Sequence, residues 1–206
     1  MKSTLKNMVL VLFTITLVCS ACVGVVNMIT EQPIADAKAK ADKTALENVL
    51  PAFDSATEAE YEIDGLAIKV YTATQADQTV GYAVKTATKE GFGGTVRLMV
   101  GFDCEGTILN INVLEQSETP GLGTKMCDEG NPLLMSFKDK KPAEMTLKVR
   151  KDGGDVDALT AATISSRAYT DAVARALAAY DKATGKASDV STGATAQKEK
   201  GDNDGK

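Results

Sequence analysis

The sequence predicts an α+β protein, with one N-terminal transmembrane helix followed by a domain built on a mostly antiparallel sheet. Three observations support this fold class. Residues 7–30 carry no charged side chain, several later runs alternate as β-strands do, and residues 165–180 place apolar residues at helical spacing. With 206 residues, the chain is long enough for one domain of ordinary size plus extensions.

The uncharged run over residues 7–30 predicts a helix that crosses a membrane, since a span needs roughly 20 apolar residues. Lys2 and Lys6 precede the run, and Glu31 is the first charge after it. The positive-inside rule then keeps the N-terminus in the cytoplasm. We therefore expect residues 1–30 to form a cytoplasmic N-terminus and a single-pass anchor in the cell (inner) membrane, with the main domain extracytoplasmic, in the periplasm.

Two cysteines inside this run, Cys19 and Cys22, leave other interpretations open. A cleaved signal peptide would have a shorter apolar stretch and a small-residue cleavage site. A lipoprotein would be acylated at Cys22, yet Cys19 stands where such signals usually carry Leu, and apolar residues continue past Cys22. We expect an uncleaved anchor in which both cysteines pack as small hydrophobic residues, with lipidation as the main alternative.

Residues 31–50 are rich in Ala, Lys and Glu and predict a helical stalk, which Pro51 ends or kinks. The main domain is expected over residues 51–181 and opens with runs that are β-branched or aromatic in places. The expected strands are residues 66–72, 79–86, 95–102, 107–114 and, later, 145–150.

Turns and helices join these strands. Residues 103–106, Asp-Cys-Glu-Gly, are expected to form a hairpin turn. Residues 123–140 mix short helical stretches with Gly and Pro breaks, and a helix beginning near Ser165 closes the domain. Residues 182–206 contain almost no large apolar residue and predict a disordered tail.

The composition excludes several kinds of chemistry. Histidine is absent, which removes Ser-His-Asp and Cys-His nucleophile systems and His-ligated zinc or haem. The net charge of -5 is spread over both signs and offers no basic face to nucleic acid. Cys104 and Cys127 are far apart in the sequence and could pair or remain free. Any chemistry must come from other side chains, backbone groups or a cofactor.

Residues 118–123 read Glu-Thr-Pro-Gly-Leu-Gly. Pro120 fixes one backbone torsion, while Gly121 and Gly123 allow the backbone to approach a ligand closely. For a lone segment of this kind, an ordinary surface turn is the better explanation.

Residues 157–163 read Asp-Ala-Leu-Thr-Ala-Ala-Thr and lead into the closing helix. Small residues and hydroxyls available as N-caps mark a helix start, where exposed N–H groups and the helix dipole favour a phosphate. Arg167 in the first turn could add a charged donor. A plain N-cap with small residues for close packing explains the same pattern without a ligand.

Residues 157–168 (DALTAATISSRA) resemble the Dxx(S/T)xAT motif of FMN-binding domains, in which the last threonine carries FMN as a phosphoester. Residues 118–123 and 91–94 (Gly-Phe-Gly-Gly) are similar to the same family in order and rough spacing. With one N-terminal membrane helix and this length, the chain resembles the G subunit of the Rnf electron transport complex. The C subunit of the sodium-translocating NADH:quinone reductase is similar but usually longer.

The resemblance implies that Thr163 accepts FMN covalently. Family members usually have SGAT, whereas residues 160–163 read Thr-Ala-Ala-Thr, so the local turn is expected to differ. A second copy of the pattern ends at Thr195, but no apolar helix follows it, and Thr163 is therefore the expected site. The resemblance also implies further FMN contacts from Glu118, Thr119, Leu122, Gly123, Thr124, Thr160, Ala162 and Ile164, and a weaker one from Lys125.

By this resemblance, the chain is an electron-relay subunit of a membrane-bound, ion-translocating ferredoxin:NAD oxidoreductase and is not expected to be active alone. Its partners would be the other Rnf subunits and a flavin transferase that moves FMN from FAD onto the threonine outside the cytoplasm. The alternatives are a membrane-anchored or lipidated extracytoplasmic binding module without a redox cofactor, and a flavin domain of a different membrane reductase.

Overall fold

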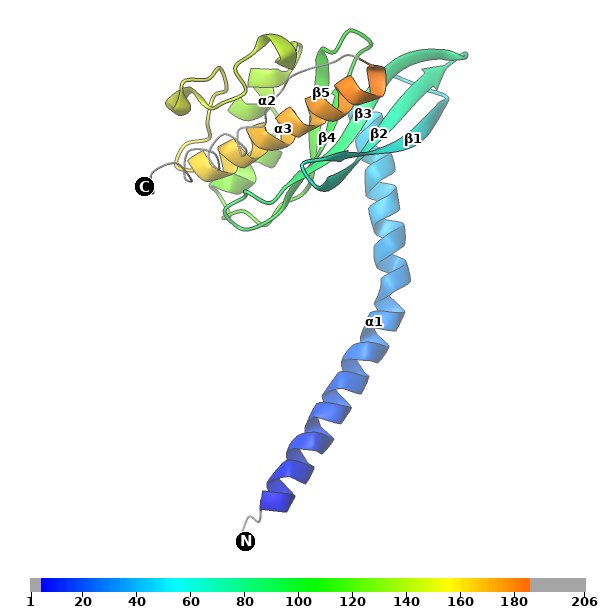
Figure 1. The fold of residues 1–206 in the computed structure, drawn as a ribbon, viewed down its shortest axis with the longest axis vertical. Coiled ribbons are helices and arrows are strands. Elements are labelled where there is room, and N and C mark those ends of the chain that lie inside the picture. Colours follow the sequence, from blue (N-terminus) through cyan, green and yellow to red (C-terminus); the bar gives the residue numbers. More distant parts are fainter. Residues whose placement is uncertain (1–4, 186–206) are drawn as a thin grey trace, which may run out of the picture. The chain divides into compact units, whose positions relative to one another are not determined.

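The computed structural model describes residues 5–185 (Figure 1). The chain divides into two compact units after Lys43. Helix α1 (Leu5–Val49) begins in the first unit, and its last residues belong to the second. Residues 186–206, which hold most of the expected tail and Thr195, lie outside the described residues.

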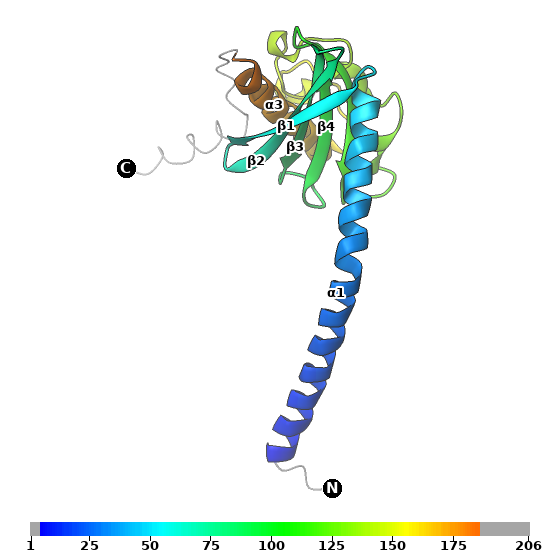
Figure 2. The same cartoon turned by 90° about the vertical axis from the view of Figure 1, so that its right-hand side faces the viewer.

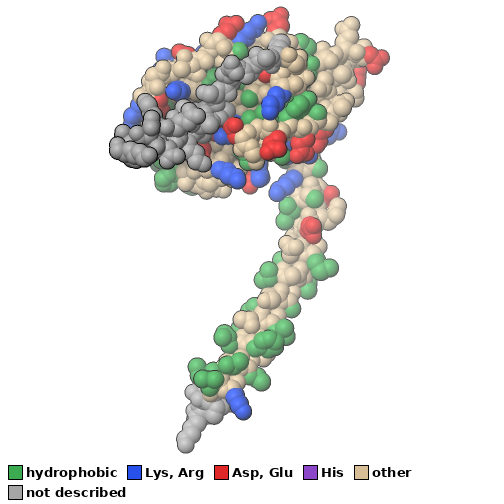
Figure 3. Space-filling view, viewed as in Figure 1, with side chains coloured by type: hydrophobic (Ala, Val, Ile, Leu, Met, Phe, Trp, Pro, Cys, Tyr) green, Lys and Arg blue, Asp and Glu red, His purple; other side chains and the backbone are tan. Residues whose placement is uncertain are grey.

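In the first unit, α1 is long and apolar enough to cross a membrane. Its most apolar 18-residue window has a mean hydropathy of 2.7, and none of that window is buried. Hydrophobic side chains cover much of this part of the helix (Figure 3). The hydroxyls of Thr14, Thr16 and Thr30 donate to carbonyls one turn earlier, at 2.8, 3.0 and 2.9 Å. These bonds satisfy the hydroxyl donors, as an apolar surrounding requires.

The predicted stalk is also helical, because α1 continues through Pro33 and ends at Val49. Pro51 follows two residues later, as expected of a residue that cannot continue a helix. Cys19 and Cys22 are free and exposed on α1. The cysteines of the second unit, Cys104 and Cys127, are free as well.

The second unit is built on one antiparallel sheet of five strands in the order of the chain, β1-β2-β3-β4-β5, of which Figure 2 labels β1 to β4. This meander confirms the predicted α+β class. The four predicted strands between residues 66 and 114 are present, each within three residues of its expected ends. The strands are β1 (Ser55–Ile63), β2 (Leu66–Gln75), β3 (Gln78–Thr88), β4 (Val96–Phe102) and β5 (Ile108–Glu115).

Strand β1 was not predicted. It is an edge strand that pairs only with β2, and nearly all of its side chains are exposed. Without a buried face it lacks the apolar alternation that identifies the other strands. Its pairing instead depends on the turn at Asp64 and Gly65, which both adopt positive φ, at 49° and 71°. Two consecutive positive φ values suit the twist of a short antiparallel hairpin.

Helix α3 (Thr163–Thr184) covers one face of the sheet (Figure 1). Ala168, Ala172 and Ala176 are completely buried and recur every four residues, so small side chains let the helix approach the strands closely. Tyr180 stacks on Phe102 with ring centroids 4.8 Å apart. The core on this face includes Ile68, Val70, Val84, Leu98, Val100, Ile108 and Leu177.

The opposite face is covered in part by the end of α1. Leu46 and Val49 pack against Tyr71 and Met99 in a second buried cluster. Gly101 makes this contact possible, because a Cβ atom there would lie 2.0 Å from the carbonyl oxygen of Val49. The last turns of α1 are therefore part of the domain's own packing.

A buried polar network links α3 to the sheet. Arg175, whose side chain is 8% exposed, donates to Asp171 and to Asp64, at 2.9 Å in both cases. Thr88 donates to the Asp171 carboxylate at 2.7 Å, and Thr86 donates to the carbonyl of Ala172 at 3.0 Å. Oδ2 of Asp171 thus accepts from both Arg175 and Thr88, whereas the buried Oδ1 has no hydrogen-bond partner among the described residues.

The predicted hairpin turn between β4 and β5 is confirmed. The Asp103 N–H donates to the Thr107 carbonyl at 2.9 Å, and the Asp103 carboxylate accepts N–H bonds from Glu105 and Thr107 at 2.8 Å. Partial burial opposes ionisation of this carboxyl, but the hydrogen bonds from Thr107, Glu105 and Gly106 prevail and lower its pKa.

The predicted strand over residues 145–150 is wrong. Only Val149 makes a bridge there, in parallel with Val156, and a short 3-10 helix follows (Arg150–Asp152). The Asp155 carboxylate accepts the N–H of Thr146 at 2.7 Å. A local side chain therefore takes a backbone donor that, in a strand, would bond to a neighbouring strand. The expected short helices over residues 123–140 are present as η1 (Gly123–Cys127) and α2 (Pro132–Phe137).

Candidate functional site

Glu118 joins three segments that are distant in the sequence. Its side chain is buried, with the residue 4% exposed. One carboxylate oxygen, Oε1, accepts the N–H of Gly93 at 3.1 Å, and the other, Oε2, accepts the hydroxyl of Ser165. The Gly-Phe-Gly-Gly loop, the Glu-Thr-Pro-Gly-Leu-Gly segment and the first turn of α3 therefore meet at one carboxylate.

Glycines surround this carboxylate because no side chain would fit. A Cβ atom at Gly123 would lie 2.6 Å from the Cβ of Glu118 and 2.7 Å from the Ser165 hydroxyl. At Gly91, a Cβ atom would lie 2.7 Å from Oε1 of Glu118, and at Gly93 only 1.7 Å from the carbonyl oxygen of Ser117. Close backbone packing, which only glycine permits, thus holds the two loops together.

The segment after Glu118 is a tight turn that leads into η1. Gly121 adopts a φ of +74°, and the Leu122 N–H donates to the Thr119 carbonyl at 3.2 Å. The Thr124 hydroxyl accepts the N–H of Gly121 at 2.9 Å. Thr119 is exposed and Thr124 half-buried, so Thr124 serves the turn itself while Leu122 points outward, 40% exposed.

Helix α3 begins at Thr163, which is half-buried. Its N-cap is Ala162, a buried residue that has no side chain to cap the helix. The expectation that a neighbouring hydroxyl caps this helix is therefore wrong. Since the first N–H groups of a helix have no partner within it, the turn at Thr163 offers free donors at the positive end of the helix dipole.

The nearby serine hydroxyls are engaged elsewhere. Ser165 donates to Glu118, and Ser166 donates to the Ala162 carbonyl at 2.9 Å while accepting the N–H of Leu159 at 2.9 Å. Thr160, two residues before the cap, is exposed. Sequence reasoning missed Ser165 as part of the site, because its role depends on a partner 47 residues away.

The backbone just before α3 is strained. Ala161 adopts a φ of +59°, the left-handed region that is costly for any residue with a Cβ atom. By the resemblance, this is the position where family members usually have glycine, and the φ of Ala161 lies in the region that glycine adopts readily.

Arg167 does not point to a free position. Its Nε and Nη2 atoms donate to the two carboxylate oxygens of Asp152 at 2.6 and 2.7 Å. The hydrogen bond from Arg167 lowers the pKa of Asp152. Arg150 and Asp157, the first residue of the motif, form a similar exposed pair. The two arginines near the start of α3 are therefore committed to carboxylates.

Exposed apolar side chains gather on the three segments that Glu118 joins. Phe92 is 67% exposed, Leu122 40% and Ile164 47%. Among residues 44–185, the only other large apolar side chain in this class is Met135. Phe92 and Leu122 are neighbours in sequence of Gly93 and Gly123, and Ile164 directly follows Thr163. Exposed apolar side chains near a helix start suit a planar ring that carries a phosphate.

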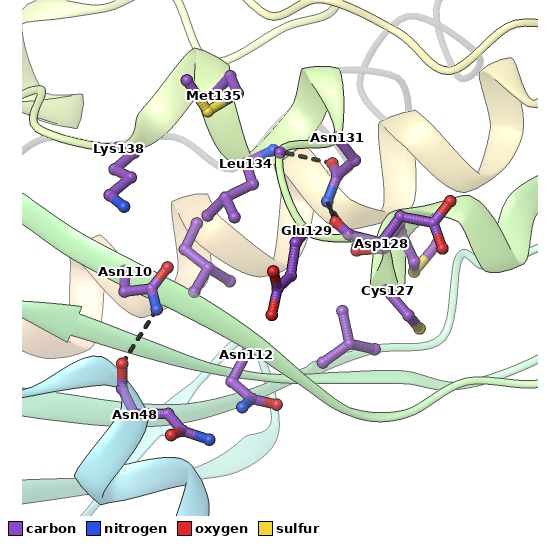
Figure 4. Close-up of a pocket in the computed structure, with 14 residues that line it drawn as sticks. Asn48, Asn110, Asn112, Cys127, Asp128, Glu129, Asn131, Leu134, Met135 and Lys138 are labelled. Carbon is purple, nitrogen blue, oxygen red and sulfur yellow. Dashed lines mark hydrogen bonds between the residues drawn. The ribbon is translucent and has the colours of Figure 1, made fainter.

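A separate cavity of about 500 Å³ lies beside the edge strand β5 (Figure 4). None of the residues that the sequence predicted as cofactor contacts lines it. Asn110 and Asn112 of β5 face Glu129 and Lys138 across it, and Met126 and Cys127 bring the end of η1 to its wall. The sequence contains no pattern that marks this cavity.

The family model of the FMN-binding domain matches residues 91–178. This range begins at the Gly-Phe-Gly-Gly loop and ends within α3, so it includes the three segments that meet at Glu118. Curated relatives cover most of the chain and share one name, that of the G subunit of an ion-translocating oxidoreductase complex.

The relative from Shewanella amazonensis is 35% identical, over 85% of this chain and 87% of its own length. The relative from Yersinia pestis is 34% identical over 74% of this chain and 79% of its own, and that from Escherichia coli K12 is 34% identical over 73% and 79%. This chain belongs to the family formed by the G subunits of ion-translocating oxidoreductase complexes, with an FMN-binding domain.

Proposed function

We propose that this chain is an electron-transfer subunit of a membrane-bound ion-translocating oxidoreductase complex and that it carries FMN on Thr163 through a phosphoester bond. The family assignment supports the first part. One observation supports the second: the start of α3 at Thr163 has no side-chain cap and lies on a segment that Glu118 joins to two loops with exposed apolar residues.

The phosphate end of FMN suits the start of α3. The Thr163 hydroxyl would form the ester, and the first N–H groups of the helix would donate to the phosphate oxygens. The helix dipole adds about 0.3–1 kcal/mol for a negative charge at such a position. Lys125 is exposed in the last turn of η1 and is a further candidate for neutralising charge.

The ring end suits the apolar surface of Phe92, Leu122 and Ile164. Bound FMN would accept and donate electrons, and the chain's own groups would set the surroundings of the ring. Among the contacts that the resemblance implies, Glu118 and Gly123 are buried, whereas Thr119 and Thr160 are exposed.

The remaining assignments follow the resemblance. Residues 1–30 would form the anchor with a cytoplasmic N-terminus, residues 31–50 a stalk, and residues 51–181 an extracytoplasmic flavin domain. The partners would be the other subunits of the complex and a flavin transferase that acts outside the cytoplasm. The complex would exchange electrons between ferredoxin and NAD and couple this to ion movement.

Co-expression with a flavin transferase tests the covalent bond. We expect the denatured chain to fluoresce in a gel under ultraviolet light, and Thr163→Val to abolish the signal because the ester acceptor is removed. Thr57→Val, at an exposed threonine of β1, is the matched control and should leave full fluorescence. Thr195→Val tests the second motif copy and should also retain the signal.

Two results would contradict the proposal. A wild-type chain that stays dark would favour an anchored binding module without a redox cofactor. Fluorescence that survives Thr163→Val would move the attachment to another residue, and loss in Thr195→Val would identify that residue as Thr195.

A further inference from the structure

We propose that Glu118 is a positioning residue whose buried negative charge lowers the reduction potential of the flavin held beside it. This inference rests on the proposed function, because it concerns FMN bound next to the start of α3. Glu118 is assigned a role inside the protein rather than as a surface contact, because its side chain is buried.

The partners of Glu118 indicate a charged carboxylate without a counter-ion. Both of its oxygens accept a hydrogen bond, which is what an ionised carboxylate does. The donors, the N–H of Gly93 and the hydroxyl of Ser165, are neutral. Within residues 5–185, no lysine or arginine forms an ion pair with Glu118. Because the residue is 4% exposed, water screens this charge poorly.

The contacts of Glu118 also hold in place the residues next to the proposed apolar surface. Gly93 directly follows Phe92, and the Cβ of Glu118 lies against Gly123, which directly follows Leu122. Ser165 is two residues beyond Thr163 on α3. Each contact of the carboxylate therefore holds a residue that is adjacent, or nearly so, to the surface on which the ring would lie.

The charge has a direct consequence for a nearby redox group. Reduction adds electrons to the isoalloxazine ring, and a negative charge close by in a poorly screened site opposes that addition. The carboxylate of Glu118 therefore favours the oxidised flavin. An uncharged side chain that keeps hydrogen bonds to the same two groups should raise the potential.

Glu118→Gln separates charge from geometry. The amide oxygen can still accept from Gly93, and the amide nitrogen can donate to the Ser165 hydroxyl, so both contacts survive without the charge. In the detergent-solubilised, flavin-loaded full chain, we expect the equilibrium constant for two-electron reduction to rise about tenfold, which corresponds to about 30 mV. Glu60→Gln, at an exposed carboxylate of β1, is the matched control and should leave the potential unchanged.

A second measurement needs no flavin. In a Thr163→Val background, amide hydrogen exchange over residues 91–94 reports the bond between Gly93 and Glu118. Glu118→Ala should accelerate that exchange, whereas Glu118→Gln should retain protection. If Glu118→Ala does not fold, the comparison of wild type with Glu118→Gln still measures the potential.

The outcomes are distinguishable. An unchanged potential in a flavin-loaded Glu118→Gln chain overturns the charge effect, and unchanged exchange in Glu118→Ala overturns the positioning role. A wild-type chain that takes up no flavin refutes the proposed function, and with it the effect on potential, while the exchange experiment still decides the positioning role.

Discussion

Two helices of the domain begin in opposite ways. Helix α2 starts at Pro132, and the side chain of Asn131 before it accepts the N–H of Leu134 at 3.0 Å. Proline at the first position removes one further N–H that would need a partner. Helix α3 starts at Thr163 behind Ala162, which offers no side-chain acceptor, and follows a strained residue at Ala161.

The difference is not a matter of missing hydroxyls. Ser165 and Ser166 lie in the first turn of α3, yet both donate elsewhere. The protein thus completes the start of α2 with its own atoms and leaves that of α3 with donors that an anion can use. A helix start built for stability can be distinguished from one built for a ligand by where the surrounding polar side chains are directed.

The largest expected effect is a loss of stability when the cap of α2 is removed. Asn131→Ala removes the cap on Leu134 and two side-chain donations, to the carbonyls of Met126 at 3.0 Å and Asp128 at 2.8 Å. We expect a loss of about 2–3 kcal/mol in the free energy of unfolding. Thermal unfolding of the solubilised chain, followed by circular dichroism, measures it. Flavin attachment at Thr163 should persist. Loss of attachment in a folded variant would contradict the view that the start of α2 serves stability alone.

The next effect concerns the strain before α3. Ala161→Gly removes the Cβ atom that makes a φ of +59° costly, so the variant should be more stable by about 0.5–1 kcal/mol. Ala178→Gly, in the middle of α3, is the matched control and should destabilise the chain by roughly 1 kcal/mol. If both variants lower the free energy of unfolding, the turn at Ala161 carries no strain.

A charge at the start of α3 gives a smaller effect. Thr163→Glu places a carboxylate where the phosphate is proposed, and we expect it to stabilise the flavin-free chain by about 0.3–1 kcal/mol relative to Thr163→Gln. Added salt should reduce the difference, because it screens the carboxylate. If the two variants unfold at the same temperature in low salt, the start of α3 does not attract an anion.

The smallest effect is on the rate of a thiol reaction near α2. Cys127 precedes this helix by a few residues, and desolvation of its thiol, helped by the carboxylate of Asp128, raises its pKa. A thiol at an open helix N-terminus would instead have a lowered pKa. At about pH 8, near the ordinary thiol pKa, the folded chain should therefore contain less Cys127 thiolate, and be alkylated more slowly there, than the chain in urea. Asp128→Asn should speed the reaction, and a folded chain that reacts faster than the unfolded one would contradict this.

The strands that the sequence predicted correctly have a buried face. β3 and β4 contain Val84, Leu98 and Val100, which are completely buried, and their alternation is visible in the sequence. β1 has almost no buried residue, and its pairing with β2 becomes visible only in the three-dimensional structure. Residues 145–150 alternate like a strand, but among the described residues no named strand pairs with them.

The site divides in the same way. The motif ending at Thr163 identifies a helix start, and the structure contains that start. The covalent bond to Thr163 stays a prediction that the fluorescence experiment decides. Arg167 was expected to add a donor to a phosphate, but it pairs with Asp152 from a different segment. Glu118 could be named from the sequence, whereas its burial and its bond to Ser165 could not.

The sequence by itself determined the apolar anchor helix, the strands with a buried face, the closing helix α3 and the family of the chain. Those features depend on local composition, periodicity and motif order, which can be read directly from the sequence. Only the tertiary structure decided that β1 joins the sheet and that one carboxylate joins three segments. The two partners of Glu118 lie 25 and 47 positions away from it, and a local pattern contains no information about which partner a polar group will find.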